Sequence, residues 1–176
     1  ACGDGNFLIA ILDRKLQRVT AHTDDPHTRQ ILALAALASI YGVDISPENI
    51  LGGHPDHPIG ARDRLLSQLS QWHHRTIGTT VNARNRFHRT ATWIVTHNIH
   101  LGDMLHNNGR DIPIVDYDWD VDAGRVTITW LTIGLIEIHA NGGTDPDLLF
   151  DDAFTTPLPE PAHTTVWDGL HLLPQH

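Results

Sequence analysis

The stretch VDYDWDVDAGRVTITW, residues 115–130, indicates the fold class more directly than any other part of the chain. From Val115 to Val121 acidic residues alternate with apolar or aromatic ones, the period of two that places one strand face in a core and the other in solvent. Ala123-Gly124 is a turn signal, and Arg125 to Trp130 is rich in β-branched residues. We therefore predict a β-hairpin whose aspartates lie on the solvated face.

Four other segments predict strands. Phe7 to Leu12 is a continuous apolar run after a glycine-rich start, and Trp93 to His97 combines aromatic and β-branched residues. Ile50 to His54 predicts a short strand that ends at a glycine-rich loop. Thr132 to Ile138 is apolar enough to lie at the centre of a sheet.

Two segments predict helices that flank these strands. Thr28 to Tyr41 has apolar residues at helical spacing with Thr28 as its N-cap, and Ala61 to His74 has the same periodicity. The polar residues 76–89 predict a connecting loop, and the proline-containing residues 144–165 predict a long surface loop. The order of elements predicts an α/β fold with a central mixed β-sheet flanked by helices.

Length and composition narrow the function classes. A chain of 176 residues suits one domain, residues 1–176, and its net charge of -9 argues against nucleic acid as a partner. No apolar run approaches the roughly 20 residues that a spanning helix needs, so we expect no membrane partner. The lone Cys2 forms no internal disulfide, which predicts a cytoplasmic location with secretion as the alternative.

Fourteen histidines make metal binding the first chemistry to consider. His54 follows a predicted strand, and Asp63 lies nine positions later at a predicted helix start. With His97 from a second predicted strand, two imidazoles and a carboxylate would leave one coordination position of a zinc ion open for water. His57 and, as a thiolate, Cys2 are alternatives to Asp63 as the third ligand.

Several segments resemble the motifs of one family of zinc enzymes. VTHNIHL at residues 95–101 resembles "VIHN-S-LP", and NILGGHPD at residues 49–56 resembles "NI-GH-D" of the anhydromuramyl-L-alanine amidases. Residues 58–63 resemble a shortened "PGRK-D", residues 2–11 resemble "CNDFSIGIE", and residues 24–30 resemble "D-PYT-Q". The order of the segments is rotated relative to the family, so the resemblance implies a circularly permuted, amidase-like fold.

The resemblance implies a zinc-dependent amidase that hydrolyses the bond between the lactyl group of a muramyl sugar and L-alanine. Its partner would be a muropeptide or peptidoglycan fragment, and its zinc ligands would be His97, His54 and Asp63. Tyr117 or Arg62 would stabilise the oxyanion.

One departure from the family motif separates two hypotheses. The glutamate that follows "SIGI" in the family falls at Leu12, so the proton-transfer role passes to Glu137 as our candidate. The same departure favours a non-catalytic module that binds muropeptide without cutting it. A redesigned or permuted scaffold whose histidines have no function is the third hypothesis.

Overall fold

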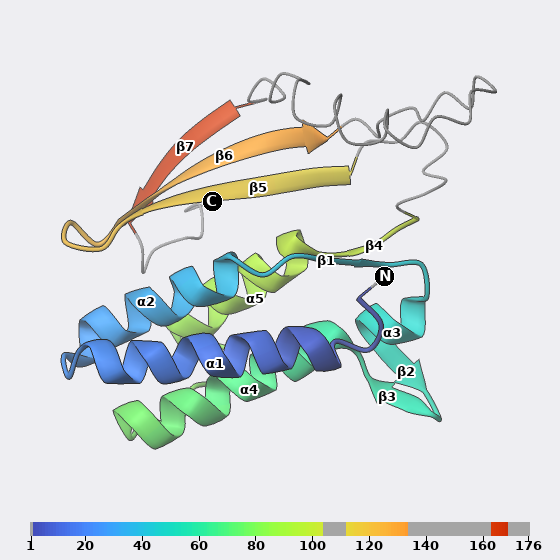
Figure 1. Ribbon diagram of the computed structural model, residues 1–176, viewed down its shortest axis with the longest axis horizontal. Coiled ribbons are helices and arrows are strands. Elements are labelled where there is room, and N and C mark those ends of the chain that lie inside the picture. The colour runs from blue at the N-terminus through green and yellow to red at the C-terminus, as the bar shows by residue number, and fades with distance from the viewer. Residues whose placement is uncertain (1, 104–111, 134–162, 169–176) are drawn as a thin grey trace, which may run out of the picture.

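The computed structural model describes residues 2–103, 112–133 and 163–168, and it arranges them in two layers. Four long helices form one layer, and a three-stranded sheet lies over helices α2 and α5 (Figure 1). The helices are α1 (Asn6–His22), α2 (Pro26–Ala38), α4 (Ala61–Ile77) and α5 (Arg86–Asn98). The described part of the chain therefore contains both helices and small sheets, which is compatible with the predicted α/β class.

Helix α1 corrects the strand predicted for Phe7 to Leu12. Its buried residues recur every three or four positions, which makes one apolar helix stripe: Leu8, Leu12, Leu16 and Val19. The apolar run is thus the beginning of a 17-residue helix. Periodicity alone does not separate a short apolar run in a strand from the same run in a helix.

Helix α5 corrects the strand predicted for Trp93 to His97. Its buried positions also follow the helical period: Phe87, Thr90, Ala91, Ile94, Val95 and Asn98. The aromatic and β-branched residues that suggested a strand instead cover the side of a helix that packs against α2, α4 and β5. Burial in tertiary contacts outweighs the modest preference of valine, isoleucine and threonine for strands.

The other two helices agree with the sequence in type and differ at their ends. Helix α2 begins at Pro26, because the Asp25 carboxylate accepts a hydrogen bond from the Thr28 backbone N–H at 2.7 Å and so replaces Thr28 as the cap. It ends at Ala38 rather than Tyr41. Helix α4 continues to Ile77, so the connection predicted for residues 76–89 contains only residues 78–85.

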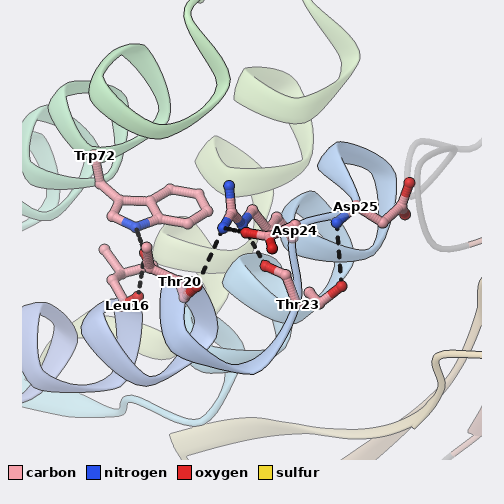
Figure 2. A network of polar contacts seen from close by, with 7 residues as sticks. Leu16, Thr20, Thr23, Asp24, Asp25 and Trp72 are labelled. Carbon is pink, nitrogen blue, oxygen red and sulfur yellow. Dashed lines mark hydrogen bonds and ion pairs between the residues drawn. The ribbon is translucent and has the colours of Figure 1, made fainter.

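The turn between α1 and α2 is held by a polar network, which Figure 2 shows from close by. The Arg29 guanidinium donates to the carbonyls of Thr20 and Thr23 and pairs with Asp24 at 2.7 Å. The buried Trp72 of α4 donates its indole N–H to the Thr20 hydroxyl at 2.9 Å. Helix α4 is thereby attached to the end of α1.

We expect Thr20→Val to lower the free energy of unfolding by about 1–2 kcal/mol, because the indole N–H of Trp72 loses its acceptor inside the protein. Chemical denaturation measures the change. Thr96→Val is the matched control, because the exposed Thr96 hydroxyl donates only to the carbonyl of Thr92 four positions earlier. Equal losses for the two variants would contradict a role for the indole bond.

Two short sheets lie at the end of the helical layer where α4 begins. Strands β1 (Gly42–Asp44) and β4 (Ile99–Leu101) pair in parallel, and β2 (Gly52–His54) and β3 (His57–Ile59) form an antiparallel hairpin. The strand predicted for Ile50 to His54 is partly wrong, because α3 (Pro47–Leu51) includes Ile50 and Leu51. A Cβ at Gly60 would lie 2.3 Å from the Ile50 carbonyl oxygen, so only glycine fits at the base of the hairpin.

The hairpin predicted at residues 115–130 is confirmed. Strands β5 (Ile112–Asp120) and β6 (Arg125–Ile133) pair antiparallel, and β7 (His163–Asp168) pairs with β6. Residues 132–133 of the strand predicted for Thr132 to Ile138 belong to β6, and the rest of that strand lies outside the described residues. Of the loop predicted for residues 144–165, only residues 163–165 are described, and they belong to β7. Among the described residues the strands form three separate sheets, which corrects the single central mixed sheet.

Candidate functional site

The C-terminal end of α5 gathers three of the residues predicted for function. Arg62, in the first turn of α4, donates from Nε and Nη2 to the carbonyl of Ile99 at 2.8 and 2.6 Å, and from Nη2 to that of Thr96 at 3.1 Å. A guanidinium at this position satisfies carbonyls that the helix itself leaves unpaired and complements the negative end of the helix dipole. Arg62 therefore joins the beginning of α4 to the end of α5.

His97, in the last turn of α5, lies among aromatic rings. Its imidazole stacks on the Trp93 indole with centroids 3.9 Å apart, and the ring of Trp130 on β6 meets it edge-on at 5.3 Å. Its Nδ1 lies 2.7 Å from the Trp93 carbonyl, which can only accept, so Nδ1 carries the proton and Nε2 carries the lone pair in the neutral ring. The imidazole is partly buried and fixed in orientation.

Tyr117 of β5 reaches the same region from the sheet. Its hydroxyl donates to Oδ1 of the buried Asn98 at 2.9 Å, and Asn98 donates in turn to the carbonyls of Ala38 and Ile40. Burial raises the pKa of Tyr117 above its ordinary value, so the hydroxyl keeps its proton. Because that proton is already donated to Asn98, Tyr117 connects the sheet to the helices.

Burial favours the neutral form of the two histidines in this region. Burial, followed by the nearby charge of Arg62, lowers the pKa of His97, and burial is likewise the main cause that lowers the pKa of His100. Nε2 of His100 is buried and has no hydrogen-bond partner in the described part of the chain. A second proton on either imidazole is therefore unfavourable at the C-terminal end of α5.

His73 is a third histidine with a lowered pKa, and it lies fully buried on α4. Its Nδ1 donates to the Thr79 carbonyl at 3.0 Å, and its Nε2 accepts from the Gln30 amide at 3.3 Å, since neither partner can act in the other sense. Protonation of Nε2 would remove the bond to Gln30. Burial is the main cause of the lowered pKa.

We expect the protein to lose stability as the pH falls below about 6.5, the ordinary pKa of histidine. His73, His97 and His100 have lower pKa values folded than unfolded, so the unfolded chain binds more protons in this window and acid favours unfolding. Denaturation curves at about pH 7.5 and about pH 5.5 measure the effect. His73→Gln should reduce the difference between them, and an unchanged difference would contradict this origin.

The β2–β3 hairpin carries the other predicted histidines. His54 and His57 are direct cross-strand partners and both are exposed. Nδ1 of His54 accepts the backbone N–H of Asp56 at 3.3 Å and lies 3.8 Å from its carboxylate. Asp63 is exposed in the first turn of α4.

The predicted zinc ligands do not fit one ion in the described residues. No group of three His, Cys, Asp or Glu side chains among them could hold a metal, and His54, His97 and Asp63 are all within that part of the chain. His57 and Cys2 do not complete such a group either. Glu137, the candidate base, lies outside the described residues, and Leu12 is fully buried in the core.

Sequence reasoning missed the neighbours of His97. Trp93 and Trp130 contact its ring, and neither was a predicted site residue. The usable signal was the spacing of four between Trp93 and His97, which places both rings on one face once residues 86–98 are read as a helix. A strand would also place positions 93 and 97 on one face, but it would not predict that His97 lies at the end of a helix.

Comparison with known proteins finds no protein-family model, no curated protein and no solved structure that matches this chain significantly. Among the described helices, none combines the length and the hydropathy needed to cross a membrane.

Proposed function

We propose that this chain is a muropeptide-binding domain that holds a peptidoglycan fragment without cleaving it. The observation that carries the proposal is the gathering of Arg62, His97 and Tyr117 at the end of α5. Two of the segments that resemble the muramyl amidases contribute Arg62 and His97 to this place. The proximity of these residues supports a ligand site here, although no group that could hold a metal is found among the described residues.

The chemistry of this place suits a sugar that carries a peptide. The partly exposed rings of Trp93, His97 and Trp130 offer flat faces against which the C–H face of a sugar packs. Arg62 supplies a positive charge beside them, which favours the carboxylates of a muropeptide. Recognition of an amphipathic ligand requires both kinds of contact.

The choice of binding over hydrolysis rests on the position of the missing glutamate. Leu12 has 0% of its surface exposed and packs within the helical core, so a carboxylate introduced there would not reach a ligand. The surroundings of this position also differ from the family's strand, since residues 6–22 form a helix.

Isothermal titration calorimetry with an anhydromuramyl tripeptide tests the proposal. We expect the wild-type chain to bind and His97→Gln to weaken the affinity by about tenfold, because the variant removes a ring that is stacked in place. His88→Gln is the matched control, since His88 lies on the same helix and is also partly buried. A wild-type chain that does not bind, or equal affinities of the two variants, would overturn the proposal.

Zinc amidase activity is the second candidate function, and the hairpin is the observation that favours it. His54 and His57 face each other across β2 and β3 and are exposed, so two imidazoles are available to a cation at the segment that resembles "GH-D". Zinc analysis together with turnover of a muramyl peptide tests it, with His54→Ala as the variant that should lose both. A metal-free protein without product would end this candidate.

A further inference from the structure

The β2–β3 hairpin presents its two histidines on one face. His54 and His57 are direct cross-strand partners, so their side chains lie on the same side of the hairpin with Cβ atoms about 5 Å apart. Both are exposed, and Pro55 and Asp56 form the turn between them. Imidazole nitrogens are common zinc ligands, and two of them at this spacing can reach one ion.

Asp56 is placed to orient the His54 ring toward a metal ion. Nδ1 of His54 accepts the backbone N–H of Asp56 at 3.3 Å and lies 3.8 Å from the carboxylate of the same residue. When the ring carries its proton on Nδ1, that carboxylate is the acceptor within reach, and the lone pair on Nε2 is free for the metal. Zinc-binding histidines have this arrangement, in which a carboxylate or carbonyl accepts from the second ring nitrogen.

One copy of the chain leaves such a site incomplete. Among the described residues, no third His, Cys, Asp or Glu side chain forms a metal-binding group with the two imidazoles. A closed structural zinc site has four protein ligands in a tetrahedron, so half of the coordination sphere would face solvent. A second hairpin, related to the first by a two-fold axis through the ion, supplies two further imidazoles.

The surroundings of the two histidines suit a second copy of the chain. The hairpin packs against α3 at the end of the helical layer and projects away from the three-stranded sheet, as Figure 1 shows, so a neighbouring molecule can approach it. Ile59 lies two positions after His57 on the same strand face and is 55% exposed. Its cross-strand partner is Gly52, which has no side chain to cover it. A partner hairpin would bury this isoleucine and gain apolar contact.

We propose that a zinc ion joins two copies of this chain, with His54 and His57 of each copy as its four ligands. The net charge of -9 on each chain opposes association, so the dimer requires the cation. The role of the ion is structural, because four protein ligands leave no position for a water nucleophile. The inference is independent of the muropeptide site at the end of α5, and it differs from the zinc amidase candidate, which needs an open coordination position.

Sedimentation velocity of the full chain with EDTA or with zinc chloride tests the inference. We expect a monomer in EDTA and about a twofold larger mass with zinc, at about one bound ion per two chains by elemental analysis. His57→Ala should stay a monomer at zinc concentrations that fully dimerise the wild type. His27→Ala is the matched control, since it removes an exposed histidine at the α1–α2 end of the helical layer, far from the hairpin (Figure 1).

A second pair of variants separates an oriented ligand from general attraction of zinc to an acidic protein. Asp56→Ala should raise the zinc concentration needed for half-maximal dimerisation about tenfold, because His54 loses the acceptor that orients it. Asp63→Ala removes the same charge from an exposed position in the first turn of α4 and should stay within about twofold of wild type. Equal shifts for the two variants would contradict the positioning role of Asp56.

Each outcome of the sedimentation experiment decides the inference. A zinc-dependent dimer of the wild type and of His27→Ala, absent in His57→Ala, supports it. No zinc binding, zinc bound to a monomer, or a dimer that persists in EDTA or in His57→Ala would overturn it. Circular dichroism checks that the variants are folded, which we expect because all the substituted side chains are exposed.

Discussion

Leu12→Glu should destabilise the protein by at least about 4 kcal/mol and leave much of it unfolded. Leu12 has no exposed surface and lies between other apolar side chains of the helical core. A glutamate there must be buried without a partner or carry a proton, and either state costs free energy. Chemical denaturation followed by circular dichroism measures the loss.

The control for this experiment is Ala10→Glu, two positions earlier on the same helix and exposed. We expect its unfolding free energy to stay within about 0.5 kcal/mol of wild type. This pair of variants also distinguishes a strand at residues 7–12 from the helix α1. If residues 7–12 were the active-site strand of an amidase, Leu12→Glu would restore the family's residue and would be tolerated, which would contradict the helix described above.

Asn98→Leu should have the second largest effect, a loss of about 3 kcal/mol in the free energy of unfolding. Asn98 is buried, donates to the carbonyls of Ala38 and Ile40, and accepts from the Tyr117 hydroxyl. Leucine of similar size leaves all three groups without a partner in the protein interior. Urea denaturation measures the difference.

Tyr117→Phe is the comparison for Asn98→Leu. It removes one hydrogen bond of the same network and keeps the ring that packs on Trp93 and Trp119, so we expect a loss of only about 1 kcal/mol. Equal losses for the two variants would show that the carbonyls of Ala38 and Ile40 do not depend on Asn98.

Local patterns in the sequence predicted the elements that depend on local chemistry. The β5–β6 hairpin follows from strict alternation and a glycine turn, and α2 and α4 follow from helical periodicity. The two wrong strands, residues 7–12 and 93–97, have apolar or β-branched composition without a long enough period to distinguish strand from helix. Their helical state is fixed by packing of α1 and α5 against the other helices.

The candidate site was less predictable than the fold because it depends on where helix ends meet. Arg62 and His97 are 35 positions apart in the sequence, and they come together because α4 begins where α5 ends. A ligand set drawn from His54, His97 and Asp63 assumed that His97 ends a strand beside the first one. Since His97 instead lies in a helix and His54 on an exposed hairpin, that convergence does not occur in the described residues.

The direct test of muropeptide binding without cleavage is to incubate the protein with an anhydromuramyl tripeptide in the presence of zinc and to follow the ligand by mass spectrometry. We expect saturable binding with the ligand recovered intact, and weaker retention by His97→Gln than by His88→Gln. Release of a peptide beginning with L-alanine in amounts that exceed the protein would contradict it. In that case the chain is a hydrolase, and the exposed pair His54 and His57 becomes the first place to seek its metal.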